Sequence, residues 1–170
     1  MRKKSALVIV SISLAFSSAS FAQKPDADPV KKLGAFLGKW QTEGIFGNGT
    51  KAKSQLECRW SPQDRYLICE QDVTLSSGHS HQLTIYGYNE KTEKYTFLTM
   101  QDNGGKPSSG DVEIKDNVWA YDLAVDDKTQ VRTLNEFTNP KTEVFKVFVS
   151  DDHGANWKLT LQGTAHKIAD

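Results

Sequence analysis

The sequence predicts an all-β fold: a single antiparallel up-and-down barrel of about ten strands with a short N-terminal helix. Short segments of alternating apolar and polar residues recur from Trp40 to His166. Turn residues separate them about every ten to fifteen positions, and no segment could serve as a crossover helix, so neighbouring strands must pair antiparallel. A sheet this long in a small domain has to close or fold over, and closure creates an interior.

Residues 1–22 have the features of a signal peptide. A positive start at Arg2, Lys3 and Lys4 precedes an apolar stretch, and Ser20-Phe21-Ala22 is a small-x-small cleavage site. We expect cleavage before Gln23 and a bacterial protein that is periplasmic or secreted. The alternative is a membrane anchor, but about 20 apolar residues are typical of a membrane span, and this stretch is shorter and half Ser and Ala. We therefore expect no integral membrane segment after cleavage.

The next segment, 23–32, is expected to be flexible and to run into a helix. Asp28 provides an N-cap and Pro29 the first helical position. Apolar residues follow at helical spacing until Gly38, namely Leu33, Phe36 and Leu37. A helix of this length can cover one end of a barrel, and we place the barrel domain at 33–170.

Ten candidate strands follow the helix. They are Trp40 to Phe46, Lys53 to Trp60, Tyr66 to Leu75, His81 to Tyr88, Lys94 to Met100, Ser108 to Ile114, Val118 to Val125, Gln130 to Thr138, Glu143 to Ser150, and Trp157 to Lys167. Their connectors are rich in Gly, Asn, Asp and Pro, the residues of tight turns. Charged residues interrupt both faces of these strands, which excludes a transmembrane barrel because its lipid face must stay apolar.

Cys58 and Cys69 are the only two cysteines, and they flank a turn containing Pro62 and Asp64. If residues 62–65 form a four-residue loop, Cys58 faces Cys69. Directly opposed cysteines at a non-hydrogen-bonded pair come within bridging distance. The export signal places them in an oxidising compartment, so we predict a cross-strand disulfide. Two buried free thiols are the alternative.

The charge balance argues against nucleic acid as a partner. The full chain has 21 basic and 21 acidic residues, and removing the three basic residues of the signal leaves 18 against 21. A mildly acidic, mixed surface lacks the concentrated basic face that nucleic-acid binding needs.

A short helix runs into a Gly-x-Trp motif at Leu37-Gly38-Lys39-Trp40. Together with the export signal, the Trp60-Ser61-Pro62 hairpin and the Tyr86-Gly87-Tyr88-Asn89 strand end, this motif resembles the calycin barrels, which comprise the lipocalin and fatty-acid-binding group. In particular, the chain resembles secreted bacterial lipocalin-like proteins of unknown function. The resemblance covers residues 33–167. It implies that Trp40 plugs the closed end and that the barrel has a pocket, but it implies no reaction.

Three other motifs favour no catalytic, metal or cofactor site. Residues 150–157 match the S-x-D-x-G-x-x-W hairpin of sialidase propellers once, in a chain too short for a propeller, so we expect only a structural turn. His79 and His81 can share a strand face, but a metal would need a third ligand. His166 has no neighbours that support haem binding. We therefore predict no metal and no cofactor.

The predicted function is extracytoplasmic binding or transport of a small, largely apolar molecule. The alternatives are a small secreted enzyme that uses the same cavity and a filled-core interaction module. We predict no catalytic residues. The candidate ligand-binding residues are Tyr86, Tyr88, Phe97, Trp119, Phe137, Arg132, Glu136 and Glu70. Even spacing puts Arg132 and Glu136 on one face. Inside the barrel they would orient a polar head group; on a solvated outer face they would form cross-strand ion pairs.

Overall fold

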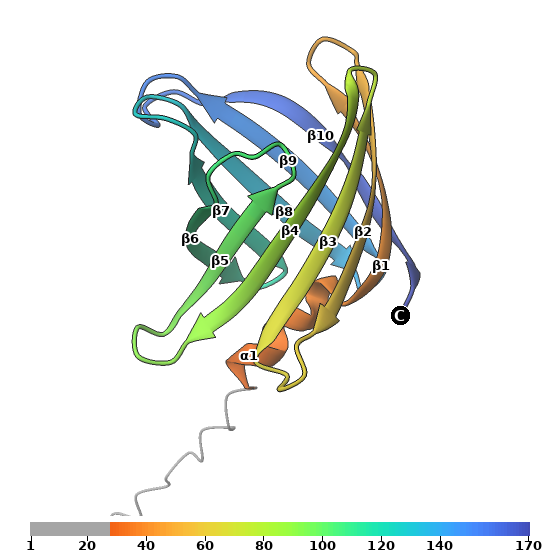
Figure 1. Ribbon diagram of the computed structural model, residues 1–170, viewed down its shortest axis with the longest axis vertical. Coiled ribbons are helices and arrows are strands. Elements are labelled where there is room, and N and C mark those ends of the chain that lie inside the picture. The colour runs from red at the N-terminus through yellow and green to blue at the C-terminus, as the bar shows by residue number, and fades with distance from the viewer. Residues whose placement is uncertain (1–27) are drawn as a thin grey trace, which may run out of the picture.

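The computed structural model describes residues 28–170, so the predicted signal peptide, its cleavage site and residues 23–27 lie outside the described residues. From residue 28 onward, the chain forms a short helix and then a closed barrel of ten antiparallel strands (Figure 1). Each strand pairs with the next one in the sequence, and the first pairs with the last. The predicted up-and-down barrel is therefore confirmed. No helix within residues 28–170 is long and apolar enough to cross a membrane.

The helical segment consists of α1 (Pro29–Lys32) and the 3-10 turn η1 (Leu33–Phe36). The strands are β1 (Gly38–Phe46), β2 (Lys51–Trp60), β3 (Tyr66–Leu75), β4 (Gly78–Asn89), β5 (Lys94–Gln101), β6 (Ser108–Lys115), β7 (Val118–Ala124), β8 (Gln130–Asn139), β9 (Thr142–Ser150) and β10 (Lys158–Ala169). These bounds differ from the predicted ones by a few residues at the strand ends.

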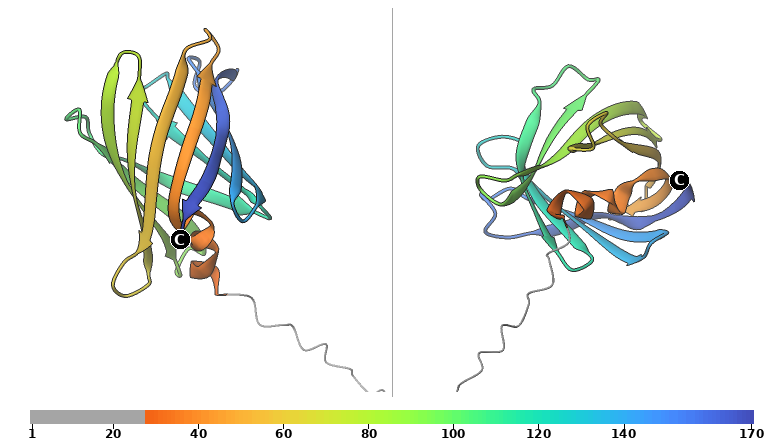
Figure 2. Two further views of the ribbon diagram at one scale, coloured as in Figure 1. Left: turned by 90° about the vertical axis from the view of Figure 1, so that its right-hand side faces the viewer. Right: turned by 90° about the horizontal axis from the view of Figure 1, so that it is seen from below.

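The helical segment covers one end of the barrel, as seen from below in Figure 2. The Asp28 carboxylate accepts a 3.1 Å hydrogen bond from the backbone N–H of Val30, which confirms the predicted N-cap. Gly38 then turns the chain into β1 with a φ of +96°, and a Cβ there would lie 2.4 Å from the carbonyl oxygen of Ala169. Only glycine fits this turn without strain.

An aromatic cluster packs beneath the barrel and forms its floor. The Phe36 ring lies 5.0 Å from that of Trp119, 4.8 Å from that of Phe137 and 6.3 Å from that of Tyr86, measured between ring centroids. Trp40 is fully buried beside them. We call Phe36, Trp40, Tyr86, Trp119 and Phe137 the aromatic floor. Trp40 therefore helps to fill the closed end, as the resemblance implied.

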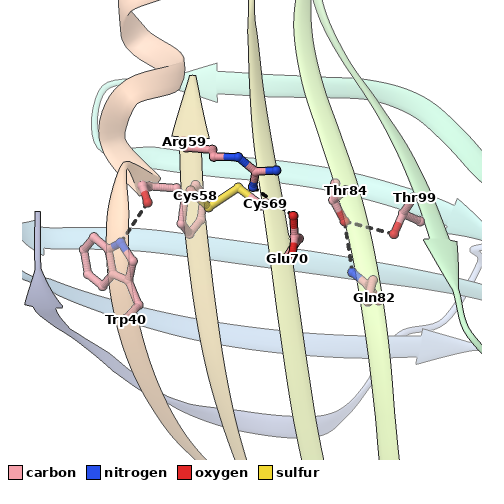
Figure 3. Close-up of a disulfide and its surroundings, with 9 residues drawn as sticks. Trp40, Cys58, Arg59, Cys69, Glu70, Gln82, Thr84 and Thr99 are labelled. Atoms are coloured by element: carbon pink, nitrogen blue, oxygen red, sulfur yellow. Dashed lines mark hydrogen bonds and ion pairs between the residues drawn. A yellow bond between two sulfur atoms is a disulfide. The ribbon is translucent and has the colours of Figure 1, made fainter. Parts of the chain in front are cut away.

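The β2–β3 hairpin contains the predicted disulfide between Cys58 and Cys69, whose Cα atoms lie 4.1 Å apart (Figure 3). The Ser61 N–H donates to the carbonyl oxygen of Tyr66 across the loop, and Trp60 pairs with Leu67. The four-residue loop thus sets the predicted register and brings the two cysteines face to face.

Alternate residues of each strand point into the barrel and out to solvent. On β2, Ala52, Ser54 and Cys58 are buried, whereas the residues between them are more exposed. Exposed ion pairs join neighbouring strands on the outer face; they are Lys39–Glu57, Lys53–Glu43, Arg59–Glu70, Lys94–Asp111 and Arg132–Asp122. Exposed pairs of this kind contribute little to stability, so the interior and the floor hold the barrel together.

Candidate ligand-binding cavity

A cavity of about 290 Å³ lies inside the barrel above the aromatic floor, and Phe36 belongs to its lining. Eight strands also contribute to the lining: β1, β2, β3, β4, β7, β8, β9 and β10. The lining consists of Phe36, Thr42, Gly44, Ala52, Lys53, Ser54, Leu56, Gln71, Val73, Gln82, Tyr121, Leu123, Thr133, Asn135, Glu143, Phe145, Val147 and Leu161.

The cavity wall combines apolar and polar side chains. Leucine, valine and phenylalanine form much of it, but two glutamines, an asparagine and several hydroxyl groups interrupt this surface. Some of the polar groups are paired with one another: the Gln71 amide donates to the Ser54 hydroxyl at 3.0 Å. Gln82 donates to Thr84 at 3.1 Å, and the Thr84 and Thr99 hydroxyls lie 2.9 Å apart (Figure 3). An apolar wall with a few polar groups is typical of a small-molecule site.

Glu143 is the one charged residue buried within residues 28–170, with 4% of its surface exposed. It lies on β9 opposite Phe137 of β8 and Ala165 of β10. No hydrogen bond or ion pair joins its carboxyl group to another group in that part of the chain. Burial raises the pKa of Glu143 from 4.5 to about 8, because the charged form is disfavoured away from water.

Two tyrosine hydroxyls lie near this carboxyl group. Burial raises the pKa of Tyr86 well above 10, and the nearby Tyr121 and the charge of Glu143 raise it further. Burial also raises the pKa of Tyr121, while hydrogen bonding to Thr133, Tyr86 and Asn135 opposes that rise. Glu143, Tyr121 and Asn135 together give one part of the cavity its polar character.

None of the eight predicted ligand-binding residues belongs to the lining of this cavity. The predicted aromatic residues lie lower in the barrel: Tyr86, Trp119 and Phe137 are in the aromatic floor, and Phe97 is buried beside Tyr121, with ring centroids 5.0 Å apart. Tyr88 packs on Tyr95 at 4.9 Å between centroids. The role of these residues in ligand binding stays a prediction.

The three predicted polar residues lie on the outer face. Arg132 makes two hydrogen bonds to Asp122, at 2.8 and 2.7 Å, and its guanidinium stacks 4.2 Å from the centre of the Trp157 ring. Glu70 accepts a 2.8 Å bond from Arg59 (Figure 3), and Glu136 is exposed. This arrangement matches the solvated outer face with cross-strand ion pairs. Their role in binding also stays a prediction.

The hairpin at residues 150–157 and the His79–His81 pair make only contacts within the protein. Asp152 accepts hydrogen bonds from the Ser150 hydroxyl and the Asn156 backbone, which hold the β9–β10 turn. His79 and His81 both face the Asp72 carboxylate, at 3.5 and 3.0 Å. No group of three or more His, Cys, Asp or Glu side chains within residues 28–170 could hold a metal ion.

His166 borders a larger hollow of about 660 Å³ on the outer face of β1, β2 and β10. This hollow is lined mainly by exposed side chains such as Gln41, Glu43 and Lys51. It lacks the enclosure that removes a ligand from water, so we place the candidate site inside the barrel.

Reasoning from the sequence missed Glu143, Gln71 and Gln82 as cavity residues. A signal for Glu143 is present, because Phe145 and Val147 follow it at even spacing and so share its face. The glutamines carry no comparable signal, because Gln71 lies between the charged Glu70 and Asp72, and Gln82 lies between His81 and Leu83.

No family model matches the chain, and no curated protein matches it. Among solved structures, the S-type phycobiliprotein lyase CPES from Guillardia theta is similar, with a TM-score of 0.57 and 10% sequence identity over 81% of this chain and 90% of that chain. A redesigned β-barrel, mFAP0, solved bound to DFHBI, gives a TM-score of 0.45 and 14% identity over 78% of this chain and 99% of that chain. The similarity to the lyase supports a lipocalin-like fold and nothing beyond the fold.

Proposed function

We propose that this protein binds or carries a small, largely apolar molecule inside its barrel. The cavity of about 290 Å³ carries this proposal. Ligand sites in proteins have volumes of about 300 to 1,000 Å³ and combine apolar walls with a few polar groups, so the cavity suits a ligand at the small end of this range. The closed barrel and the aromatic floor supply rigid walls, which reduce the entropic cost of binding.

The proposal includes an extracytoplasmic location in a bacterium, within the lipocalin-like group that the sequence resembles. The Cys58–Cys69 disulfide supports it, because such bonds persist in oxidising compartments. The proposed ligand class is argued from the lining of the cavity and not from the fold, since one fold hosts many functions.

The test is titration with phenylnaphthylamine, a neutral apolar fluorophore. We expect saturable binding at one site with a dissociation constant in the micromolar range (about −8 kcal/mol). Leu161→Trp should abolish it, because Leu161 lines the cavity and a larger ring would fill the space. The matched control is Leu159→Trp on the same strand, where 39% of the leucine is exposed.

Equal affinity in the two variants would place the fluorophore elsewhere and overturn the proposal. Failure of the unmodified protein to bind in a saturable manner would also overturn it. The filled-core interaction module would then be the better description.

A further inference from the structure

The cavity contains a carboxyl group that the protein leaves without a partner. Every fully enclosed side-chain nitrogen or oxygen within residues 28–170 has a hydrogen-bond partner. Only 4% of the surface of Glu143 is exposed, yet no hydrogen bond to its carboxyl group is present in that part of the chain. Its oxygens must therefore touch open space, and the space that Glu143 lines is the cavity.

No protein cation compensates for this carboxyl group. Lys53 is the only basic residue in the cavity lining, but its ammonium group lies on the outer face, 65% exposed and 3.1 Å from Glu43. The titratable groups that face Glu143 from other strands are the hydroxyls of Tyr86 on β4 and Tyr121 on β7, both held neutral by burial. The remaining neighbours are uncharged, so a positive charge that balances the ionised form of Glu143 can come only from a ligand.

We propose that the ligand carries a basic nitrogen, and that the ionised carboxylate of Glu143 pairs with the resulting cation inside the cavity. This inference rests on the proposed function and names its ligand class: a small apolar molecule with one amine or amidine group. The side chains of Leu56, Leu123 and Phe145 would contact the apolar part. A charge-assisted hydrogen bond in a low-dielectric site is stronger than its counterpart in water, so one carboxylate can select for a cation.

The test compares naphthylethylamine with its neutral analogue naphthylethanol by isothermal titration calorimetry near pH 7, where the amine is charged. We expect the unmodified protein to bind the amine about 10- to 100-fold more tightly than the alcohol, as a charge-assisted hydrogen bond implies. Glu143→Gln should remove this preference and change the affinity for the alcohol by less than about twofold. Glu113→Gln, on the exposed face of β6, is the matched control and should keep the preference.

A second measurement needs no variant. The carboxyl group is protonated near neutral pH in the free protein, so pairing with a cation must release a proton from Glu143. Titrations of the unmodified protein in buffers of different ionisation enthalpy should show proton release with the amine and none with the alcohol.

The outcomes separate the two proposals. If neither compound binds in a saturable manner, the cavity does not take small molecules and the proposed function fails with this inference. If both bind with equal affinity and without proton release, the proposed function stands and the cationic ligand is excluded. A preference for the amine that survives Glu143→Gln would also overturn the role of Glu143.

Discussion

The indole Nε1 of Trp40 donates a 2.8 Å hydrogen bond to the carbonyl oxygen of Phe36, four residues earlier in the chain (Figure 3). Both residues are buried in the aromatic floor. The bond spans the turn at Gly38 and so ties the helical segment to the first strand. The floor is therefore fixed by a polar contact as well as by ring packing, and it sets the lower limit of the cavity.

Replacing Trp40 with Phe should lower the free energy of unfolding by about 1 to 3 kcal/mol, because the buried Phe36 carbonyl loses its donor while most of the ring is kept. Urea denaturation followed by circular dichroism measures the change. Trp60→Phe is the control, since Trp60 packs partly buried against the same core and its indole makes no hydrogen bond within residues 28–170. Equal losses in the two variants would show that ring volume alone matters.

Removing the disulfide by Cys58→Ala with Cys69→Ala should lower the free energy of unfolding by about 2 to 3 kcal/mol, the value for a loop this short. The covalent link restricts the unfolded chain, so its loss favours unfolding. Thermal melting with and without reductant checks the result. Reductant should lower the melting temperature of the unmodified protein and leave that of the double variant unchanged. Equal melting temperatures for the oxidised unmodified protein and the double variant would contradict a stabilising role for this bond.

The strands, the N-cap and the disulfide could be predicted because each depends on local chemistry. Pro62 to Arg65 fix the length of one loop, and the loop length alone decides that Cys58 faces Cys69. Asp28 and Pro29 start the helix in the same local way. Closure of the barrel follows from the number of strands in a short chain.

The cavity lining could not be predicted, because a period of two says which residues share a face and not which face points inward. Gln82 lines the cavity, whereas the apolar Leu83 pairs with Glu70 on the outer face. The usual rule of apolar residues inside is reversed there. The positions of Trp119 and Phe137 in the aromatic floor could not be predicted either. Their contacts with Phe36 depend on where the helical segment enters the barrel, which is a long-range property.

Gly163→Ala should destabilise the seam between β1 and β10. A Cβ at Gly163 would lie 2.1 Å from the carbonyl oxygen of Glu43 and 2.6 Å from the Phe145 ring, so the strand or the ring must move. Overpacking of this kind costs about 1 to 3 kcal/mol, to be measured by urea denaturation. Gly47→Ala is the control, since a Cβ there approaches nothing closer than 3.9 Å. A harmless Gly163→Ala would mean that the seam has more room than the structure shows.

The buried Glu143 should make the protein less stable as the pH rises from about 4.5 to about 8. In this window the unfolded chain has an ionised glutamate, whereas the folded protein keeps its proton. The folded state therefore binds more protons, and the free energy of unfolding falls as the pH increases. The raised pKa corresponds to a loss of roughly 3 to 5 kcal/mol across the window, and above it the effect levels off.

Other groups also act on the stability in this range, so the difference between two proteins is the useful quantity. Asp72 raises the pKa of His81, and the stability that this contact contributes is likewise lost with increasing pH. Glu143→Gln leaves that contact intact and removes only the carboxyl group. The variant should match the unmodified protein near the lower end of the window and become the more stable of the two towards its upper end. Denaturation curves collected across the window test this. Parallel pH profiles for the two proteins would mean that Glu143 ionises as freely in the folded barrel as in the unfolded chain.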